Sequence, residues 1–563
     1  MVASQSVDLY SINFGGNNMK KLLSLLLACL LLAGCASNGV VQEKAEPAAV
    51  ETEKALANIA ALSDGTVLDD NYRTWYEIFV YSFCDSNGDG IGDLKGAESK
   101  LDYLTELGIN GIWLMPIHPS QSYHKYDVAD YYEIDPAYGT LDDFRDFLAA
   151  CNERDIHVIL DLVLNHTANN HEWFLTACDY LRSLPAGAEP DVEACPYVGY
   201  YYFSRQQEAP YYYEVTGSEW YYEGKFSPDM PDLDLANGLV RQEIEAIMRY
   251  WLDMGVAGFR LDAVKEFYSG DTPKNVEVLS WIQELATSIK EDVYLVAECW
   301  DGFGAVTEYY TSGLTSFFNF PFGTTDGVVI DTVRAAGRES AVKNYAINLE
   351  KAHKAYSGAN PNYIDAPFLS NHDVGRIAGF CNRDEYKTKL AGAMNLLMGG
   401  SAFIYYGEEI GMIGSGNDPS KRAPTYWNVA RDNGTTTPPP ECELPESYPF
   451  GSLEEQLYDD ASVYNYYRQL IATRKALPVI SHGVPTVEAA LNTGCVSAQR
   501  KTWGEESCII LMNVNTEAAQ VDLSAYTDWT LAVTLSANGE PIAMEEATLN
   551  MAPFGVAILI PAK

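Results

Sequence analysis

The feature that most constrains the fold of this chain is a repeated alternation of short apolar runs with amphipathic helical patterns. Six runs have the character of buried strands, at residues 111–116, 157–166, 255–264, 292–300, 368–373 and 402–409. Helical periodicity fills intervals between them, for example at 141–155 and 238–255. Strands that alternate with helices form parallel sheets. We therefore predict an α/β fold of the (β/α)8 TIM-barrel type.

Polar or ionisable residues stand at the ends of four of these runs. They are Asn165, Asp262, Glu298 and Asp373. In a (β/α)8 barrel the carboxyl ends of the strands meet on one face, and the chemistry of barrel enzymes is placed there. The pattern therefore predicts one shared site.

Two segments break the alternation and indicate further domains. Residues 166–235 are rich in Tyr, Pro and Gly and are too long for a plain loop, which predicts an excursion domain after the third strand. Residues 479–563 alternate short apolar runs with Gly, Asn and Thr turns, which predicts a C-terminal all-β sandwich domain. The barrel is then expected to comprise residues 71–165 and 236–478.

The first 35 residues have the pattern of an export signal. Residues 1–18 are a polar leader, and Met19 opens a segment with two lysines followed by an apolar run at 22–32. This run is too short for a confident transmembrane helix and is typical of a secretory signal.

The end of this signal carries a cysteine in a distinctive setting. Leu32-Ala33-Gly34-Cys35 resembles a bacterial lipobox, which implies cleavage before Cys35 and acylation of its thiol. Residues 36–70 then form an Ala/Glu-rich tether. We expect an exported lipoprotein anchored in a membrane, at the cell surface or facing the periplasm. An ordinary signal peptide and a secreted protein are the alternative.

The charge of the chain excludes several classes of partner. With 37 Lys and Arg against 78 Asp and Glu, the formal net charge is −41. Binding to nucleic acid requires a basic face, and an anionic membrane surface repels such a chain. A neutral substrate fits best, and contact with a membrane is expected only through the lipid anchor.

Cysteine usage leaves the disulfide pattern open. Of the 11 cysteines, two belong to the signal, and the odd remainder predicts at least one free thiol. Cys178 with Cys195, and Cys495 with Cys508, are pairs that could form. No Cys or His spacing indicates zinc.

One acidic, glycine-rich stretch has the spacing of a calcium loop. Its oxygen donors are Asp85, Asn87, Asp89 and Asp93, with the backbone carbonyl of Ile91 between them. Hard oxygen ligands on a tight turn suit Ca²⁺, although the glutamate at position 12 of an EF-hand is missing here. We predict a structural Ca²⁺ site, with a solvated Asp/Gly turn as the alternative.

Four ordered motifs carry a resemblance to a known family. They are Asp161 to His166, Gly258 to Ala263, Ala297-Glu298 and Asn371-His372-Asp373. Together with the fifth segment, Met230 to Asp234, they resemble the signature regions of the α-amylase family, glycoside hydrolase family 13. The resemblance covers roughly residues 72–475 and, more weakly, the C-terminal domain.

This resemblance implies a role for each matched residue. Asp262 matches the nucleophile, Glu298 the general acid/base and Asp373 a third carboxylate that stabilises the transition state. Contacts to the substrate are implied for Tyr126, His166, Arg260, Lys265, His372, Asp418 and Arg422. Two positions depart from the family pattern: Lys125 replaces a frequent glycine, and Glu266 replaces a common histidine.

The chemistry of the residues agrees with these roles. A retaining glycosidase needs an acid and a nucleophile about 5–5.5 Å apart. Asp262 and Glu298 are 36 residues apart, about one strand–helix–strand step, so neighbouring strands can bring them together. Arg260 is two residues before Asp262 and faces the same side of a strand, where a guanidinium keeps the carboxylate ionised.

The leading functional hypothesis is an endo-acting α-1,4-glucan hydrolase that acts on starch, an α-amylase, and we expect a monomer. An α-glucosidase, a neopullulanase-like enzyme or a transglycosylase on the same scaffold is the first alternative. Ala263 after the nucleophile resembles α-1,4-acting members of the family. A non-catalytic glucan-binding lipoprotein is less favoured, because all three carboxylates are present.

Overall fold

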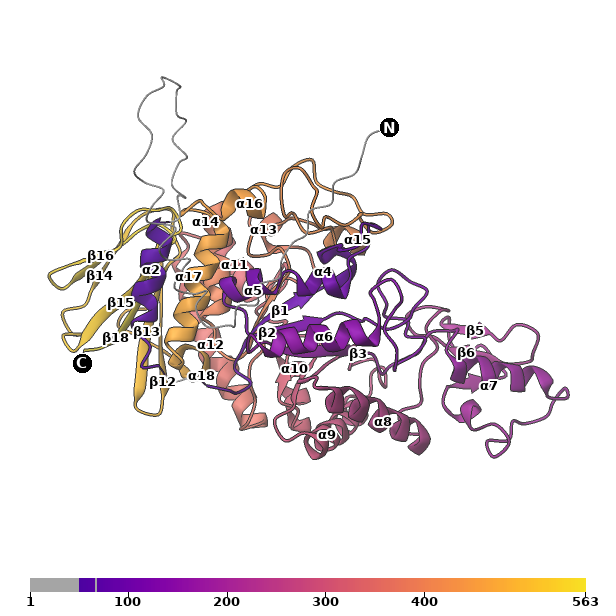
Figure 1. Ribbon diagram of the computed structural model, residues 1–563. Coiled ribbons are helices and arrows are strands. Elements are labelled where there is room, and N and C mark those ends of the chain that lie inside the picture. Colours follow the sequence, from indigo (N-terminus) through magenta and orange to yellow (C-terminus); the bar gives the residue numbers. More distant parts are fainter. Residues whose placement is uncertain (1–49, 66–67, 563) are drawn as a thin grey trace, which may run out of the picture. The chain divides into compact units, whose positions relative to one another are not determined.

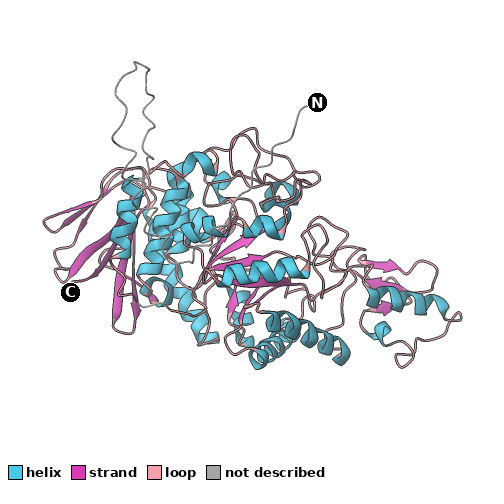
Figure 2. Cartoon of the chain, viewed as in Figure 1, coloured by secondary structure: helices cyan, strands magenta, loops and turns pink. Residues whose placement is uncertain are grey.

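A curled parallel sheet forms the centre of the protein in the computed structural model, which describes residues 50–65 and 68–562 (Figures 1 and 2). Its order is β10-β1-β2-β3-β7-β8-β9, and β10 pairs with β1. The strands are β1 (Thr74–Ile78), β2 (Gly111–Leu114), β3 (His157–Leu162), β7 (Gly258–Leu261), β8 (Tyr294–Ala297), β9 (Ser316–Phe317) and β10 (Ala402–Tyr405). All seven run parallel.

The remaining barrel position, between β9 and β10, is held by a short segment. Ala366 makes an isolated parallel bridge to Phe318, and the Phe403 N–H donates to the Pro367 carbonyl at 2.8 Å. These contacts complete the predicted (β/α)8 barrel.

The prediction of a strand at 368–373 is wrong. The Asn371 side chain accepts the N–H groups of Asp373 and Val374 at 2.8 and 2.9 Å. This local turn replaces strand pairing.

Helices surround the barrel, and their ends follow local sequence signals. α6 starts at a capping box made by Thr140 and Asp143, and α8 ends at Gly255, whose φ of 112° suits glycine. The barrel helices are α3 (Val80–Phe83), α4 (Leu94–Glu98), α5 (Leu101–Leu107), α6 (Leu141–Asn152), α8 (Gly238–Met254), α9 (Thr272–Ile289), α10 (Phe303–Tyr309), η2 (Tyr310–Ser312), α11 (Val328–Arg334), α12 (Glu339–Ala359), α13 (Ile377–Phe380), α14 (Glu385–Leu396), α15 (Asp418–Lys421), α16 (Leu453–Gln456), α17 (Val463–Ala476) and α18 (Val479–His482).

The interior of the barrel is filled by large side chains, not left as a pore. Trp75 stacks on Tyr294 with ring centroids 5.1 Å apart, and Phe318 packs against Phe403 at 4.9 Å. These residues are buried in one cluster that also contains Trp113. This packing supports the carboxyl ends of the strands, where the candidate residues lie.

Two smaller parts extend from the barrel. Between β3 and α8 the chain forms α7 (Glu172–Ser183), η1 (Pro196–Gly199) and a three-stranded sheet of β4 (Phe203–Ser204), β6 (Tyr221–Glu223) and β5 (Tyr212–Glu214). The C-terminal part has a five-stranded sheet of β11 (Val484–Val487), β12 (Val496–Trp503), β13 (Glu506–Asn513), β18 (Val556–Pro561) and β15 (Trp529–Leu535). Its second sheet has three strands, β14 (Ala519–Asp522), β17 (Thr548–Met551) and β16 (Ala543–Glu545).

The segment predicted as a tether is partly folded. Residues Val50–Ala60 form helix α2, which packs along α17. The Thr52 N–H donates to the Asp460 carboxylate at 2.7 Å, and Glu53 pairs with Arg468 at 2.9 Å. Ile59 is buried. The tether prediction is therefore wrong for residues 50–60, because this stretch is an amphipathic helix with a partner. The leader, the signal and Cys35 lie outside the described residues.

Two further points concern the described part of the chain. None of its helices combines the length and the apolar composition needed to cross a membrane. Its nine cysteines are all free thiols, so neither of the two cysteine pairs considered from the sequence forms a disulfide in this structure.

Candidate active site

The arginine in strand β7 organises the acidic residues at the carboxyl ends of the neighbouring strands. Arg260 is fully buried. One of its terminal nitrogens contacts Asp161 at 2.8 Å and Asp262 at 2.5 Å, and the other donates to Glu298. A planar guanidinium suits this task because its donors are held in a fixed fork. The predicted nucleophile and the predicted acid/base therefore share one cation.

Glu298 follows strand β8 and sits in a buried, acidic environment. Burial raises the pKa of its carboxyl to about 7, with Asp262 and Asp373 acting in the same direction and Arg260 opposing them. The Ala263 N–H donates to Glu298 at 3.3 Å, from a residue whose φ is 43°. A non-glycine residue in this region is strained, and such strain gathers at functional sites. The carboxyl can thus hold a proton near neutral pH.

A second group of charges surrounds His372. Its Nδ1 lies 2.6 Å from Glu77, and its Nε2 lies 3.0 Å from Asp373 and 2.6 Å from the Tyr126 hydroxyl. Burial by itself would lower the pKa of His372, but the Asp373 and Glu77 carboxylates raise it to about 9. The imidazole is therefore a cation at neutral pH, held between two carboxylates.

Asp373 receives a further cation from the loop after β10. Arg422 donates to its carboxylate at 2.8 Å, and Lys421 donates to its backbone carbonyl at 2.7 Å. Burial would raise the pKa of Asp373, but His372 and then Arg422 hold it well below its usual range. Asp418, at the start of the same loop, is exposed and pairs with Lys421 at 2.9 Å. This loop thus joins a predicted sugar contact to the third carboxylate.

His166 has the features of a residue that awaits a ligand. It is 2% exposed, yet its Nε2 has no hydrogen-bond partner within the protein. Burial of a polar atom without a partner is costly. The neighbouring Asn165 amide donates to Asp232 at 3.0 Å, and Asp232 also accepts the Lys225 N–H at 2.9 Å. Asn165 therefore acts as a donor toward Asp232 in this structure.

Two exposed aromatic rings lie next to these residues. Trp300, two positions after Glu298, is 48% exposed and stacks on Phe320. Phe226 is also 48% exposed and packs against the ring of His166. Lys265 lies at the same rim, where it donates to the Trp300 carbonyl at 3.0 Å and pairs with Asp301 at 2.6 Å. Large exposed rings of this kind suit stacking on a sugar.

The predicted calcium loop lies apart from this network, between α3 and α4. Its side-chain oxygens face backbone N–H groups of the loop itself: Asp85 accepts from Gly88 at 2.7 Å, and Asp89 accepts from Ile91 at 2.8 Å. Asp93 caps α4. Gly88 and Gly90 have φ values of 85° and 93°, which glycine adopts at no steric cost. The chain therefore wraps tightly around its oxygen donors.

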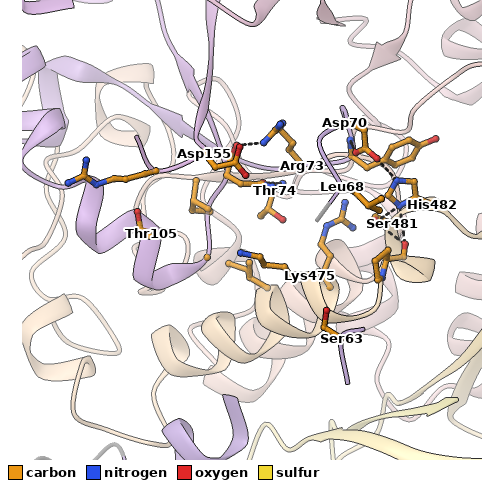
Figure 3. A pocket seen from close by; sticks show the side chains of 18 of the residues that line it. Ser63, Leu68, Asp70, Arg73, Thr74, Thr105, Asp155, Lys475, Ser481 and His482 are labelled. Carbon is orange, nitrogen blue, oxygen red and sulfur yellow. Dashed lines mark hydrogen bonds and ion pairs between the residues drawn. The ribbon is translucent and has the colours of Figure 1, made fainter. Parts of the chain in front are cut away.

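A cavity of about 370 Å³ lies elsewhere, at the opposite end of the barrel (Figure 3). Its lining includes Thr74, the first residue of β1, and Asn110, which precedes β2. Figure 3 shows Asp70 paired with His482 on one side of it. None of the candidate residues lines this cavity, so its size does not mark the candidate site.

Beside this cavity, the carboxylates of Asp69 and Asp155 converge with the imidazole of His157. The guanidinium of Arg73 contacts Asp69 at 2.5 Å and lies 2.9 Å from His157 Nε2. This cluster therefore already holds a cation of the protein itself.

The structure thus brings most of the predicted site residues together. Asp262, Glu298, Asp373, Tyr126, Arg260, His372 and Arg422 form one connected network, in which Asp161 contacts both Arg260 at 2.8 Å and the Tyr126 hydroxyl at 3.0 Å. Burial lowers the pKa of His166, and the nearby Asp262 carboxylate opposes this. Lys265 and Asp418 lie at the rim of the network. Glu77 was missed. A charged residue inside the otherwise apolar strand Thr74–Ile78 was the signal that could have found it.

Comparison with known proteins agrees with this geometry. A model of the α-amylase catalytic domain matches residues 77–483. The chain is 39% identical to alpha-amylase 3 of Dictyoglomus thermophilum over 415 residues, which cover 73% of this chain and 78% of that protein. It is 29% identical to glucan 1,6-alpha-glucosidase of Streptococcus pneumoniae over 71% of this chain and 83% of that one. The solved structure of Eubacterium rectale Amy13B superposes with a TM-score of 0.87 at 42% identity, covering 92% of this chain and all of that one.

Proposed function

The chain belongs to the α-amylase family of glycoside hydrolases, and on that premise we propose that it is an endo-acting α-amylase that cleaves α-1,4-glucosidic bonds of starch and maltooligosaccharides. The observation that carries this proposal is the shared contact of Arg260 with Asp262 and Glu298. Arg260 holds the Asp262 carboxylate, the nucleophile, beside the Glu298 carboxyl group, whose pKa of about 7 suits an acid catalyst.

In the first step, a carboxylate oxygen of Asp262 attacks the anomeric carbon as the glycosidic bond breaks. Glu298 donates its proton to the departing oxygen, so the leaving sugar departs as an alcohol. A covalent β-glycosyl ester on Asp262 results. In the second step, Glu298 takes a proton from water, and the oxygen of that water attacks the same carbon. The ester bond breaks, Asp262 is released and the product retains the α configuration.

The remaining residues hold the sugar and stabilise developing positive charge. Asp373 stays ionised because His372 and Arg422 contact it, and a fixed negative charge favours an oxocarbenium-like transition state. His166 offers its unpartnered Nε2 to a sugar hydroxyl. The ring of Tyr126 supplies a stacking surface at the cleavage site, and Trp300 and Phe226 supply exposed rings for further sugars.

Cleavage of α-1,6 bonds or of short substrates from one end is the second candidate function. It is favoured by the similarity to a glucan 1,6-alpha-glucosidase. Ala263, directly after the nucleophile, favours cleavage of α-1,4 bonds. Products from amylose, pullulan and isomaltose separate the two, because an endo-acting α-1,4 enzyme releases mixed maltooligosaccharides from amylose and leaves isomaltose intact.

We propose Ca²⁺ as a structural ligand of the Asp85–Asp93 loop. The donor set consists only of oxygens, and the two left-handed glycines let the backbone curl around them. The residues that would hold the ion are Asp85, Asn87, Asp89 and Asp93, with the carbonyl of Ile91. The ion would stabilise the loop and would take no part in the chemical steps.

We also propose that the mature protein is a monomeric lipoprotein anchored through Cys35. The support is the order of basic residues, apolar run and Leu-Ala-Gly-Cys sequence at 19–35. A lipid anchor is compatible with the strongly negative net charge, because attachment through acyl chains needs no basic surface.

The assay for the proposed function is turnover of soluble starch by Asp262→Asn and Glu298→Gln. Each substitution should abolish turnover while the protein remains folded and still melts in one cooperative transition. Asp262→Asn removes the attacking carboxylate, and Glu298→Gln removes the transferable proton. Full activity in either variant would refute the assigned roles. Asp253→Asn, at an exposed position of α8 outside the candidate site, is the matched control and should retain full turnover.

A further inference from the structure

The segment between β2 and α6 carries Tyr126 and is built as a closed loop. We call residues 115–140 the β2 loop, which fills the interval between these two elements. At its base the Asp135 N–H donates to the Ile117 carbonyl at 2.8 Å, and further along the Ala129 N–H donates to the Pro119 carbonyl at 2.8 Å. The second bond closes off residues 120–128, which we call the tip, and the tip contains Tyr126.

Tyr126 joins the tip to the candidate site. Its hydroxyl donates to the Asp161 carboxylate at 3.0 Å and lies 2.6 Å from His372 Nε2. Its ring stacks on the His372 ring, with the centroids 5.2 Å apart. The place of the Tyr126 ring is therefore set jointly by the barrel and by the backbone of the tip.

The residue before Tyr126 has a backbone conformation that is unusual for its type. Lys125 has a φ of 67°, a left-handed value that is uncommon for a residue other than glycine. Such a conformation persists where the surrounding structure imposes it. The Lys125 N–H donates to the Ser122 hydroxyl at 3.1 Å, but this backbone bond does not require a lysine. The reason for a lysine at this position therefore lies in its side chain.

The Lys125 side chain connects the tip to the base of the loop. Its ammonium pairs with the Asp135 carboxylate at 2.7 Å, and both residues are buried. The ammonium also lies 5.5 Å from the centroid of the buried Tyr138 ring, close enough for a cation–π contact. Asp135 is itself held in place, because its carboxylate accepts the Ala137 N–H at 2.9 Å. The ion pair thus ties the tip to a fixed point.

A second acidic residue acts within the tip, on the other side of Tyr126. Asp127 is buried, and its carboxylate accepts the Ser120 hydroxyl at 2.6 Å and the Gln121 N–H at 3.2 Å. These partners belong to the tip, so Asp127 shapes the tip without attaching it to the base. The attachment is made by the ion pair of Lys125.

We infer that Lys125 is a positioning residue, whose ion pair with Asp135 fixes the tip of the β2 loop so that the ring of Tyr126 is held at the cleavage site. This inference rests on the proposed function, since it takes Tyr126 as a contact of the sugar. The ion pair offsets the strain of the Lys125 backbone. Fixed geometry is valuable here, because a displacement of about 1 Å can cost about 100-fold in rate.

Steady-state kinetics on a chromogenic maltooligosaccharide test the role of the pair. Lys125→Met removes the ammonium, and Asp135→Asn removes the negative charge but keeps an oxygen for the Ala137 N–H. We expect each substitution to lower kcat/KM by about 10- to 100-fold, as for a displaced contact. Lys125→Arg keeps a cation and should retain more of the wild-type kcat/KM than Lys125→Met does.

The double variant Lys125→Met/Asp135→Asn separates positioning from stability. Each single variant leaves one buried charge without its partner, which destabilises the fold, whereas the double variant leaves none. Its melting temperature should therefore lie above those of both single variants, while its kcat/KM stays low. A pair that served only to balance charge would instead let kcat/KM recover together with the melting temperature.

Tyr126→Ala provides a readout that a purely structural role would not move. In this background the double change at Lys125 and Asp135 should lower kcat/KM by less than about 2-fold, because the ring to be positioned is absent, whereas independent effects would multiply. The matched control is Arg500→Met with Glu488→Gln. It removes an ion pair that is also 2.7 Å long, in the C-terminal part, and should leave kcat/KM unchanged.

The outcomes distinguish this inference from the proposed function. Wild-type kcat/KM in the double variant, or multiplied losses in the Tyr126→Ala background, would refute the positioning role and leave the proposed function intact. Unchanged kcat/KM in Tyr126→Ala would refute the sugar contact of Tyr126 and the inference with it. Absence of turnover of the maltooligosaccharide by the wild type would refute the proposed function itself.

Discussion

Removal of the charge of Arg260 should move the alkaline limit of activity to higher pH. Arg260 opposes the effect of burial on Glu298, whose pKa is raised to about 7. Two unit charges about 4 Å apart interact by about 4 kcal/mol at an effective dielectric constant of about 20, and about 1.4 kcal/mol changes a pKa by one. The charge of Arg260 can therefore change the pKa of Glu298 by at most about 3. We expect Arg260→Gln to raise the Glu298 pKa by about 1 to 2, which keeps this acid protonated to higher pH.

The same substitution should lower both rate and stability. Loss of one preorganised donor costs about 100- to 1,000-fold in kcat, and removal of one partner from a buried ion pair costs about 3–5 kcal/mol of unfolding free energy. The raised carboxyl pKa sets the sign of the pH dependence. The folded variant binds protons more tightly than the unfolded chain, so its stability deficit is smallest near pH 5 and grows toward pH 9.

The assay is kcat/KM on a chromogenic maltooligosaccharide between pH 5 and 10, together with the melting temperature at each pH. Arg260→Lys is the control: it keeps the charge but not the fork of donors, so it should lose rate with a smaller shift of the alkaline limit. An alkaline limit of Arg260→Gln that stays in place or moves to lower pH would refute this role of the Arg260 charge, and so would identical pH profiles of the two variants.

Three further predictions address other parts of the molecule. Chelation should lower the melting temperature of the wild type, because a ligand that binds only the folded state stabilises it; Asp89→Ala should reproduce this loss, and an unchanged melting temperature would exclude the metal. Glu77→Gln should lower the pKa of His372 from about 9, and NMR titration of labelled histidines measures it. A raised histidine pKa stabilises the fold below about pH 6.5, and this stabilisation is lost as pH rises through the folded pKa. In that variant the alkaline loss of stability should therefore be smaller and complete at a lower pH; an unchanged titration would exclude the pairing. Cys35→Ala should move the protein from the membrane fraction to the soluble exported fraction, and soluble behaviour of both forms would exclude the anchor.

The sequence allowed the barrel and its charged face to be predicted because both depend on local patterns. Buried strands read as apolar runs, and Asp262 and Glu298 each follow such a run directly. Pairing between strands distant in sequence is not local. The stretch at 368–373 has an apolar start, yet the side chain of Asn371 captures the N–H groups that a strand would have paired.

The parts that escaped prediction depend on contacts across long sequence separations. Glu77 became relevant only when β1 placed it against His372, 295 residues later in the chain. Gly434 and Thr437 contact Asp85 and Gly90 from more than 300 residues away in the chain. The departure from the family pattern at Lys125, in contrast, was visible in the sequence. Its φ of 67° explains why glycine suits this position, and its ammonium pairs with Asp135 at 2.7 Å.

Helix α2 limits how far the proposed lipid anchor at Cys35 would let the protein extend from a membrane. With the proposed lipid on Cys35, only 14 residues, 36–49, separate the anchored residue from the helix fixed on α17. At about 3.5 Å per residue this stretch spans roughly 50 Å when fully extended, whereas the 35 residues from 36 to 70 would span roughly 120 Å. An anchored enzyme would thus work within a shell about one protein diameter deep, and it would meet glucan chains that come to the surface of the cell.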